Sequence, residues 1–442
     1  MSSTVSTLEA PPRRAVGAGS GWALGVAGAL VLVSWLVGLW LTRTGVDLHL
    51  GTTWPLRGQW RPAGSVGLVA AAVVAGLAVW HAPLLAVRLS WRRLLGAGYT
   101  AGVAWPVSLA LSDGLAGLTR PLSNRWEYPY DVPRVGPDFL ATFNDHVLDS
   151  PQWTTHVGGH PPGALGVFVL LDRVGLGGAL PAALLCIAVG AAAVPAVLST
   201  VRLYAGEEFA RRTAPYLVFA PAALWIATSA DALFAGVGAL GVCALAHAAT
   251  RHDRKGDLLA AAGGLALGGC LFLSYGLLLL GPLAVGVVAV RRRIRPLLVG
   301  GAVVLALLVA AALAGFHWYE GLQLATERVR SGPAWQDRPG WYFWIANPAA
   351  VAIAVGPAVV AALPAGLRRR TPGMVLWVCA LGAIAVATAS GLSKGEVERI
   401  YLPFLVWLLL LAGLLPERHT RRWLAAQVGL AIALEALLWF WW

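Results

Sequence analysis

The sequence predicts an all-α, polytopic membrane protein with about 13 transmembrane helices. Of its 442 residues, 58% are hydrophobic and only 12% are charged, and the mean hydropathy is +0.70. Soluble domains carry roughly twice that share of charged residues. A segment that crosses lipid must satisfy its own backbone hydrogen bonds, and an α-helix does so without a partner segment. The composition therefore favours a bundle of apolar helices over a soluble domain.

The apolar runs of the sequence place these helices. Residues 1–20 are polar and are predicted to form a cytoplasmic tail without a cleavable signal peptide, because the apolar run that follows is of span length. The rest of the chain, 21–442, is predicted to form a single membrane domain. The expected spans are 21–42, 64–86, 95–117, 178–200, 213–230, 232–250, 257–274, 276–290, 296–315, 347–366, 373–390, 401–415 and 423–441.

The net charge of +12 comes from basic clusters that lie in short loops separated by pairs of spans. This placement follows the positive-inside rule, so we expect these loops to face the cytoplasm and to contact anionic lipid headgroups. The same placement argues against a nucleic-acid partner. The clusters are Arg13/Arg14, Arg88/Arg92/Arg93, Arg202/Arg211/Arg212, Arg251/Arg254/Lys255, Arg291 to Arg295, Arg368 to Arg370 and Arg418/Arg421/Arg422.

The apolar run at 163–172 is predicted not to cross the membrane. It has about half the length that a span needs, and if it crossed, every later basic cluster would lie on the wrong side. We therefore expect a helix at the outer surface. This topology places two long loops, 118–177 and 316–346, and the short SKGEVER loop, 391–400, on the extracytoplasmic face, where most of the polar chemistry gathers. The functional site is expected to face that side.

The first outer loop contains two carboxylates just beyond a predicted span. Glu127 or Asp131 could act as a general base, or both could form salt bridges with Arg125 and Arg134. Apolar residues at a spacing of three to four predict an amphipathic helix at 139–148 on the membrane surface.

Two histidines follow that helix. His156 and His160 could bind a divalent metal together with Asp149, although their spacing is not diagnostic of a metal site. His160 could instead contact a ligand or make a structural hydrogen bond. It precedes Pro161 and Pro162, which are expected to set the angle at which the next helix begins.

The order of these features resembles the first outer loop of the GT-C superfamily, which includes protein O-mannosyltransferases and lipid A aminoarabinose transferases. The counterparts here are the acids of EYPYD, the helix at 139–148, and the HPPG sequence at His160 to Gly163. The similarity continues through 178–250, where Asp231 stands in the place of the family's outer-face aspartate. The segment SGLSKGEVERIYLPF resembles actinobacterial cell-envelope members of the superfamily, among them the methylthioxylose transferase group that acts on lipoglycans.

This resemblance implies an inverting glycosyltransferase of the cell membrane. Such an enzyme takes a sugar from a polyprenyl-phosphate donor and passes it to a hydroxyl of a cell-envelope glycan, lipoglycan or protein on the extracytoplasmic face. The reaction needs a carboxylate to take the acceptor's proton and a cation to stabilise the departing phosphate. Because EYPYD replaces the acidic pair of the family, both Glu127 and Asp131 are candidates for the base.

Arg399, with Lys394, is the candidate for the phosphate, since arginine offers a planar fork of donors. The alternative for both cations is pairing with Glu396 and Glu398. Asp231 could orient the acceptor or a metal, or it could cap the helix that follows. The remaining candidates for substrate binding are His160, Tyr275 between two predicted spans, Arg338 in the second outer loop and the intramembrane acid Asp113.

Two other functions are compatible with parts of this pattern. A transporter or flippase of a lipid-linked sugar would need charged groups along a path through the membrane. A polysaccharide polymerase or ligase would also use an outer loop. The concentration of acids and bases on one face favours the glycosyltransferase.

Overall fold

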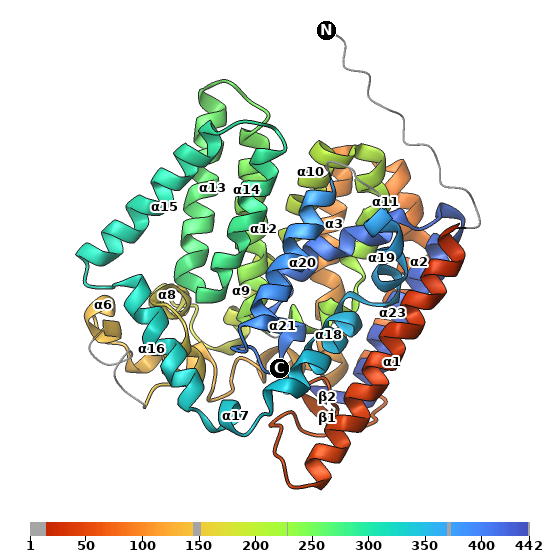
Figure 1. Ribbon diagram of the computed structural model, residues 1–442, viewed down its shortest axis with the longest axis horizontal. Coiled ribbons are helices and arrows are strands. Elements are labelled where there is room, and N and C mark those ends of the chain that lie inside the picture. The colour runs from red at the N-terminus through yellow and green to blue at the C-terminus, as the bar shows by residue number, and fades with distance from the viewer. Residues whose placement is uncertain (1–14, 145–151, 228, 369–372, 441–442) are drawn as a thin grey trace.

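The computed structural model describes residues 15–144, 152–227, 229–368 and 373–440, and within these ranges the regular structure is almost entirely helical (Figure 1). The predicted all-α polytopic membrane class is confirmed. Among the described residues, seven helices are long and apolar enough to cross a membrane, or up to nine if each of two bent pairs is one span. The seven are α1 (Ala15–Arg43), α2 (Val66–Arg88), α3 (Trp91–Ala110) with η1 (Leu111–Asp113), α9 (Ala179–Ala191) with α10 (Ala193–Ala205), α12 (Ala230–Ala248), α13 (Arg254–Leu273) and α15 (Arg295–Leu313).

The other six predicted spans are shorter or broken. The first bent pair is α18 (Gly340–Val355) with α19 (Pro357–Arg368), at 104°, and the second joins the predicted spans 401–415 and 423–441 at 109°. Glycine and proline cause these breaks: Gly356 (φ 80°) separates α18 from α19, and Pro416 interrupts the second pair. The remaining elements of this group are α11 (Glu207–Val218), η4 (Pro221–Trp225), η5 (Tyr275–Leu280), α14 (Gly281–Ala289), α20 (Met374–Ala389), α22 (Leu402–Leu408), η6 (Leu409–Leu414), η7 (Glu417–His419) and α23 (Thr420–Leu437).

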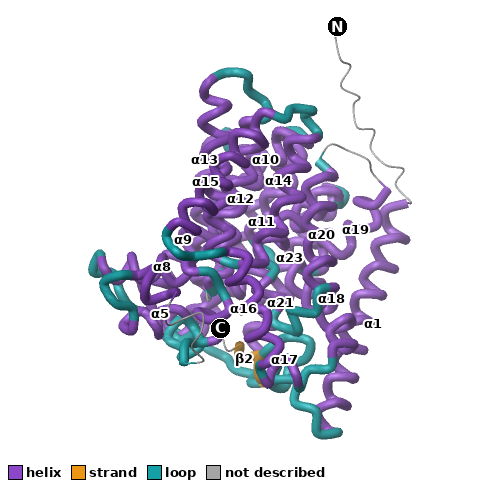
Figure 2. The backbone as a smooth tube through the Cα atoms, turned by 60° about the vertical axis from the view of Figure 1, so that its left-hand side comes forward, coloured by secondary structure: helices purple, strands orange, loops and turns teal. Residues whose placement is uncertain are grey.

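Most of the short helices gather at one end of the bundle, where Figure 2 shows them among loops near the strand pair. One of them, α8 (Pro162–Arg173), has 12 residues and is not among the helices long enough to cross a membrane, as predicted for 163–172. Of the helix expected at 139–148, α6 covers Phe139–Thr142, and 145–148 lie outside the described residues. The others are α4 (Leu115–Thr119), α5 (Tyr128–Asp131), η2 (Val132–Arg134), α7 (Thr155–Gly159), α16 (Trp318–Ser331), α17 (Pro333–Gln336) and α21 (Val397–Ile400).

A small antiparallel strand pair joins distant parts of the chain at this same end. Strand β1 (Gly58–Trp60) pairs with β2 (Leu438–Phe440), with Gly58 opposite Phe440. Gly58 permits the close approach, because a Cβ there would lie 2.8 Å from the carbonyl oxygen of Trp439. The predicted span 423–441 is therefore too long, since its helix ends at Leu437 and the chain continues as a strand.

Small residues let the central helices pack closely. Gly264 of α13 lies against α15, where a Cβ would come within 2.3 Å of the carbonyl oxygen of Gly300. Helix α12 packs against α9, α10 and α13 and is buried along most of its length. In contrast, α15 exposes Leu298 and Leu305, as a helix that faces lipid does.

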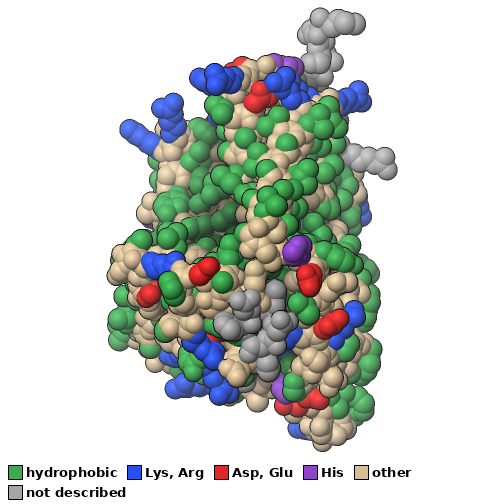
Figure 3. Space-filling model, turned by 90° about the vertical axis from the view of Figure 1, so that its left-hand side faces the viewer, with side chains coloured by type: hydrophobic (Ala, Val, Ile, Leu, Met, Phe, Trp, Pro, Cys, Tyr) green, Lys and Arg blue, Asp and Glu red, His purple; other side chains and the backbone are tan. Residues whose placement is uncertain are grey.

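The charges lie at the two ends of the helices. Figure 3 shows mainly basic side chains with a few acidic ones at the upper end, a largely hydrophobic band below them, and acidic and basic side chains together at the lower end. This is the distribution that the positive-inside rule predicts for a membrane protein with its basic loops on one side. Which end faces the outside of the cell stays a prediction.

Candidate active site

A cavity of about 450 Å³ lies where the short helices meet the bundle. Segments far apart in the sequence form its walls: the predicted first outer loop, the start of α12, the turn at η5, helix α16 and the SKGEVER segment. Five of the residues that the sequence analysis selected line it, namely Glu127, His160, Asp231, Tyr275 and Arg399. The fold therefore brings together a carboxylate, an arginine and other polar side chains, the farthest of which are more than 270 positions apart in the sequence.

Glu127 is the carboxylate of the predicted first outer loop that faces this cavity. It precedes α5 in extended conformation, and its side chain is buried, with Oε1 3.1 Å from Nδ1 of His156. The next residue, Tyr128, stacks on Phe168 of α8 with ring centroids 5.5 Å apart, which fixes the backbone at this point. Burial acts to raise the pKa of Glu127, but the neighbouring His156 and Arg399 outweigh it, so the pKa lies below its ordinary value. The side chain is thus an ionised carboxylate that can accept a proton.

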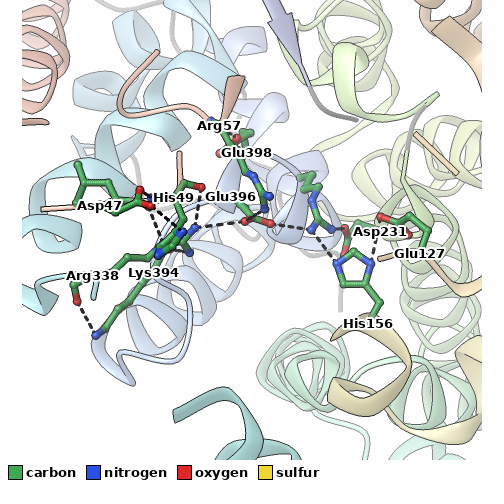
Figure 4. A network of polar contacts seen from close by, with 12 residues as sticks. Asp47, His49, Arg57, Glu127, His156, Asp231, Arg338, Lys394, Glu396 and Glu398 are labelled. Atoms are coloured by element: carbon green, nitrogen blue, oxygen red, sulfur yellow. Dashed lines mark hydrogen bonds and ion pairs between the residues drawn. The ribbon is translucent and has the colours of Figure 1, made fainter. Parts of the chain in front are cut away.

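His156 links this carboxylate to Arg399. A guanidinium can only donate, so the 3.1 Å contact between Nη2 of Arg399 and the histidine makes Nε2 the acceptor. The ring proton of the neutral imidazole is then on Nδ1, which donates to Glu127. The histidine therefore holds the carboxylate and the arginine in a fixed relation. Figure 4 shows His156 beside Glu127 and Asp231.

Arg399, in α21, is the central cation of a buried ionic network. Its Nη1 lies 2.7 Å from Oδ2 of Asp231, and its Nη2 lies 2.8 Å from Oε2 of Glu396. Although burial acts to lower the pKa of Arg399, the surrounding carboxylates raise it further above its ordinary value. The guanidinium is held as a fixed positive charge at the cavity wall.

Glu396 is shared by three arginines. Besides Arg399, it pairs with Arg57 and lies 3.6 Å from Nη2 of Arg338. Burial acts to raise its pKa, but these three positive charges bring the pKa down to about 2. Glu396 also has a left-handed backbone (φ 62°), which is uncommon for a residue with a side chain and is typical of functional sites.

Asp231 and His160 complete the polar wall. The N-cap of α12 is Ser229, and Asp231 lies in the first turn, where it pairs with Arg399, so the alternative that Asp231 caps the helix is wrong. His160 donates from Nδ1 to the carbonyl oxygen of His156, at 2.9 Å. Burial lowers the pKa of His160 to about 4, so the ring is neutral near pH 7 and its Nε2 is an acceptor.

Asp131, the other candidate for the base, does not line the cavity. Its Oδ2 accepts the backbone N–H of Thr154 at 2.9 Å, and its Oδ1 lies 2.9 Å from Nη1 of Arg134. The side chain is fully buried. Asp131 thus forms the salt bridge with Arg134 that was the alternative to acting as the base.

Lys394 and Arg338 hold the SKGEVER loop from outside the cavity. Lys394 donates to the carbonyl oxygens of Trp335 (2.7 Å) and Arg338 (2.8 Å), and its ammonium lies 3.8 Å from the centre of the Trp335 ring. Arg338 donates to the carbonyl oxygens of Leu48 and Lys394. The sequence also allowed Lys394 and Arg399 to pair with Glu396 and Glu398. Arg399 does pair with Glu396, whereas Lys394 donates to carbonyl oxygens.

Asp113 lies elsewhere. It pairs with Arg120 at 2.9 Å and borders a separate hollow beside the strands. Asp113 was predicted to bind substrate, but it does not line the cavity around Glu127.

The metal hypothesis has little support from the geometry. Both ring nitrogens of His156 are engaged, by Glu127 and Arg399, and Asp149 lies outside the described residues. Among the residues that the structure describes, no group of three or more His, Cys, Asp or Glu side chains could hold a metal ion.

Sequence reasoning missed three residues of this site. His156 was considered only as a metal ligand, and Glu396 only as an ion-pair partner; its spacing of three from Arg399 was the available signal. Arg57 gave no signal, because it lies in a loop more than 330 residues from its partner.

No family model matches the chain, and no curated protein matches it. Among solved structures, the chain is similar to the crystal structure of ArnT from Cupriavidus metallidurans in the apo state, with 19% identity and a TM-score of 0.41. The similarity covers 70% of this chain and 58% of that chain, so the chain spans less than two thirds of the protein it matches.

The link through His156 gives a first prediction. Replacing His156 with Phe removes both contacts, and we expect the rate of the reaction that depends on Glu127 to fall about 100-fold, because the carboxylate loses its orientation. Replacing it with Gln retains one donor and one acceptor and should keep the rate within about tenfold of the parent. Steady-state rates of the two purified variants, compared at equal thermal stability, provide the measurement. Equal losses in both variants would contradict this role.

Proposed function

We propose that the protein is an integral membrane glycosyltransferase of the GT-C type, which transfers a sugar from a polyprenyl-phosphate donor to a hydroxyl of a cell-envelope glycan, lipoglycan or protein on the extracytoplasmic side. The observation that carries this proposal is the cavity in which ionised Glu127 and cationic Arg399 face a shared space. A base and a fixed cation are the two groups that this transfer requires.

The walls of the cavity support a lipid-linked donor. Its polar lining residues include Glu127, Asp231 and Arg399, and much of the remaining lining is leucine, valine and phenylalanine. Leu278 and Val386 line the cavity and are more than half exposed. Apolar side chains of this kind would keep an isoprenoid chain out of water.

The proposed reaction is a single displacement. The acceptor oxygen attacks the anomeric carbon from the face opposite the phosphate, so the new C–O bond forms as the bond to the phosphate oxygen breaks, and the configuration inverts. Glu127 takes the acceptor's proton, and the electron pair of the broken bond goes to the phosphate, whose charge Arg399 stabilises. Tyr275 lines the cavity, and its buried hydroxyl has no hydrogen-bond partner among the described residues.

The positions of the buried charges favour an enzyme over a transporter. Among the described residues, the buried acidic and basic side chains all belong to predicted outer loops or to the outer ends of helices. A transport path would need such groups through the depth of the membrane. These buried residues are Glu127, Asp131, Asp231, Arg338, Glu398 and Arg399.

A transfer assay with purified protein in lipid nanodiscs tests this function directly. The protein is incubated with a panel of polyprenyl-phosphate pentoses and hexoses and with envelope glycans from a deletion strain. We expect it to release polyprenyl phosphate and to extend the glycan. The same protein in proteoliposomes should leave the donor on its original leaflet. Movement of an intact donor across the bilayer without any transfer would instead establish a flippase and would overturn the proposal.

A further inference from the structure

A second polar cleft lies beside the strand pair, apart from the cavity. It consists of two hollows, of about 90 and 540 Å³, whose walls share Arg120 and Trp439. We call it the strand cleft. Its other polar wall residues include Gln59, Arg61, Asp113, Asn124 and Glu435. Together the two hollows have the size of a small-molecule site, and the cavity around Glu127 includes none of these residues.

The chemistry of the strand cleft suits a neutral polyhydroxylated ligand. Its two arginines, Arg61 and Arg120, share the lining with two carboxyl groups, those of Asp113 and Glu435. Arg120 lies 2.9 Å from Asp113 and also stacks over the Trp439 ring, 5.5 Å from its centroid. Sugar hydroxyls both donate and accept hydrogen bonds, so they can use both kinds of side chain, whereas an anion would meet the carboxylates.

Trp439 contributes an independent observation. Its indole N–H is buried and has no hydrogen-bond partner in the described part of the chain. A buried donor without a partner costs free energy unless a ligand or water satisfies it. Trp439 forms part of the wall of both hollows, so this unpaired donor belongs to a residue that the two hollows share.

The strand cleft adjoins the candidate active site at two points of the chain. Asn124 lies three residues before Glu127 and accepts its backbone N–H at 3.0 Å, so their Cα atoms are at most about 11 Å apart. On the other side, β1 directly follows Arg57, which pairs with Glu396. The same two stretches of chain thus contribute to the strand cleft and to the ionic network beside Glu127.

We propose that the strand cleft binds the acceptor, as a neutral oligosaccharide, through sugar units other than the one whose hydroxyl reacts. The part played in transfer rests on the proposed function, whereas oligosaccharide binding at the strand cleft does not. The two can therefore be tested separately.

Binding is measured on the Glu127→Gln protein in nanodiscs by saturation-transfer NMR, with linear tetrasaccharides of mannose, arabinose and glucose as probes and a tetrasaccharide of uronic acid as the anionic comparison. We expect at least one neutral probe to bind. Arg120→Gln and Gln59→Ala should each weaken that binding about tenfold, the effect of losing one good hydrogen bond. Arg120 and Asp113 are both about 40% exposed, so the first change should cost little stability.

Arg125 provides the matched control. Its guanidinium stacks on exposed Trp126, 4.5 Å from the ring centroid, in the same loop, but neither residue lines the strand cleft. Arg125→Gln should bind the probes like the parent. In active protein, Arg120→Gln should raise the KM for acceptor about tenfold and leave kcat at saturating acceptor unchanged.

The outcomes separate the two proposals. Any of three results would overturn the proposal that the strand cleft binds the acceptor. The first is that none of the three neutral probes binds, and the second is that the anionic probe binds more tightly than they do. The third is equal affinity for the probe in the parent, Arg120→Gln and Gln59→Ala proteins. Binding that depends on Arg120 in a protein that transfers no sugar would support oligosaccharide recognition by the strand cleft while overturning the glycosyltransferase.

Discussion

Replacing Glu127 with Gln should reduce sugar transfer about 1,000-fold, within the range by which a positioned base accelerates proton transfer. Glutamine keeps the size of the side chain and can still accept the hydrogen bond from His156, but it cannot take the acceptor's proton. The single-turnover rate at saturating donor and acceptor, with donor binding measured separately, isolates the chemical step. We expect donor affinity to change little.

Asp131→Asn is the matched control, because this acid lies four residues away in the same loop. It holds the backbone of Thr154 and the side chain of Arg134 and does not line the cavity. We expect the free energy of unfolding to fall by about 1–2 kcal/mol, since one buried charge-assisted contact is weakened, and the transfer rate to stay within a few-fold. Loss of transfer in Asp131→Asn with retention in Glu127→Gln would assign the base to Asp131 instead.

The pH profile offers an independent measurement on Glu127. A base acts in its deprotonated form, so activity is lost as the pH falls through the pKa of the folded enzyme. Because the pKa of Glu127 lies below its ordinary value of 4.5, transfer should not decline between pH 7 and pH 5 on account of this group. A decline in that interval that disappears in Glu127→Gln, measured on its residual activity, would mean that the carboxyl is protonated there.

The sequence predicted the elements of this fold better than its bends. Seven of the 13 predicted spans are long apolar helices, because length and hydropathy are local properties of the sequence. The 104° turn at Gly356 and the strand at Leu438–Phe440 depend on contacts with distant segments. The last span was predicted to run to residue 441 because the residues that form the strand are as apolar as the helix before them. Nothing in that run indicates that Phe440 pairs with Gly58.

The candidate site shows the same limit. Glu127 and Asp231 are predicted from their place in the motif that resembles the GT-C loop, and Arg399 from the planar donors of its guanidinium. Their partners could not be predicted from the sequence. Only the ion pair with Glu396 connects Arg57 to the site, and only the contacts of its two ring nitrogens distinguish His156 from other loop histidines. The choice between Glu127 and Asp131 likewise depended on which of the two faces the cavity, and that is decided by the tertiary structure.

The ionic network predicts a second large effect, at Arg399. Arg399→Lys keeps a positive charge, but one ammonium cannot maintain the contacts of the planar guanidinium with Asp231, His156 and Glu396. We expect kcat/KM for the donor to fall about 100- to 1,000-fold, because the cation no longer holds its place against the departing phosphate. Arg399→Gln would leave buried carboxylates unpaired and should lower stability by about 3–5 kcal/mol, so lysine is the informative change.

Arg338→Lys separates the role of Arg399 from simple loop anchoring. Arg338 is also a buried arginine near Glu396, but it donates to backbone carbonyls and does not line the cavity. We expect this variant to lose thermal stability while the folded protein keeps kcat/KM for the donor within about tenfold, because the cation nearest the proposed phosphate is intact. Donor kcat/KM and the affinity for free polyprenyl phosphate, measured on both variants, should diverge. If they fall together, Arg399 acts by holding the loop, and the cation for the phosphate must be sought elsewhere in the cavity.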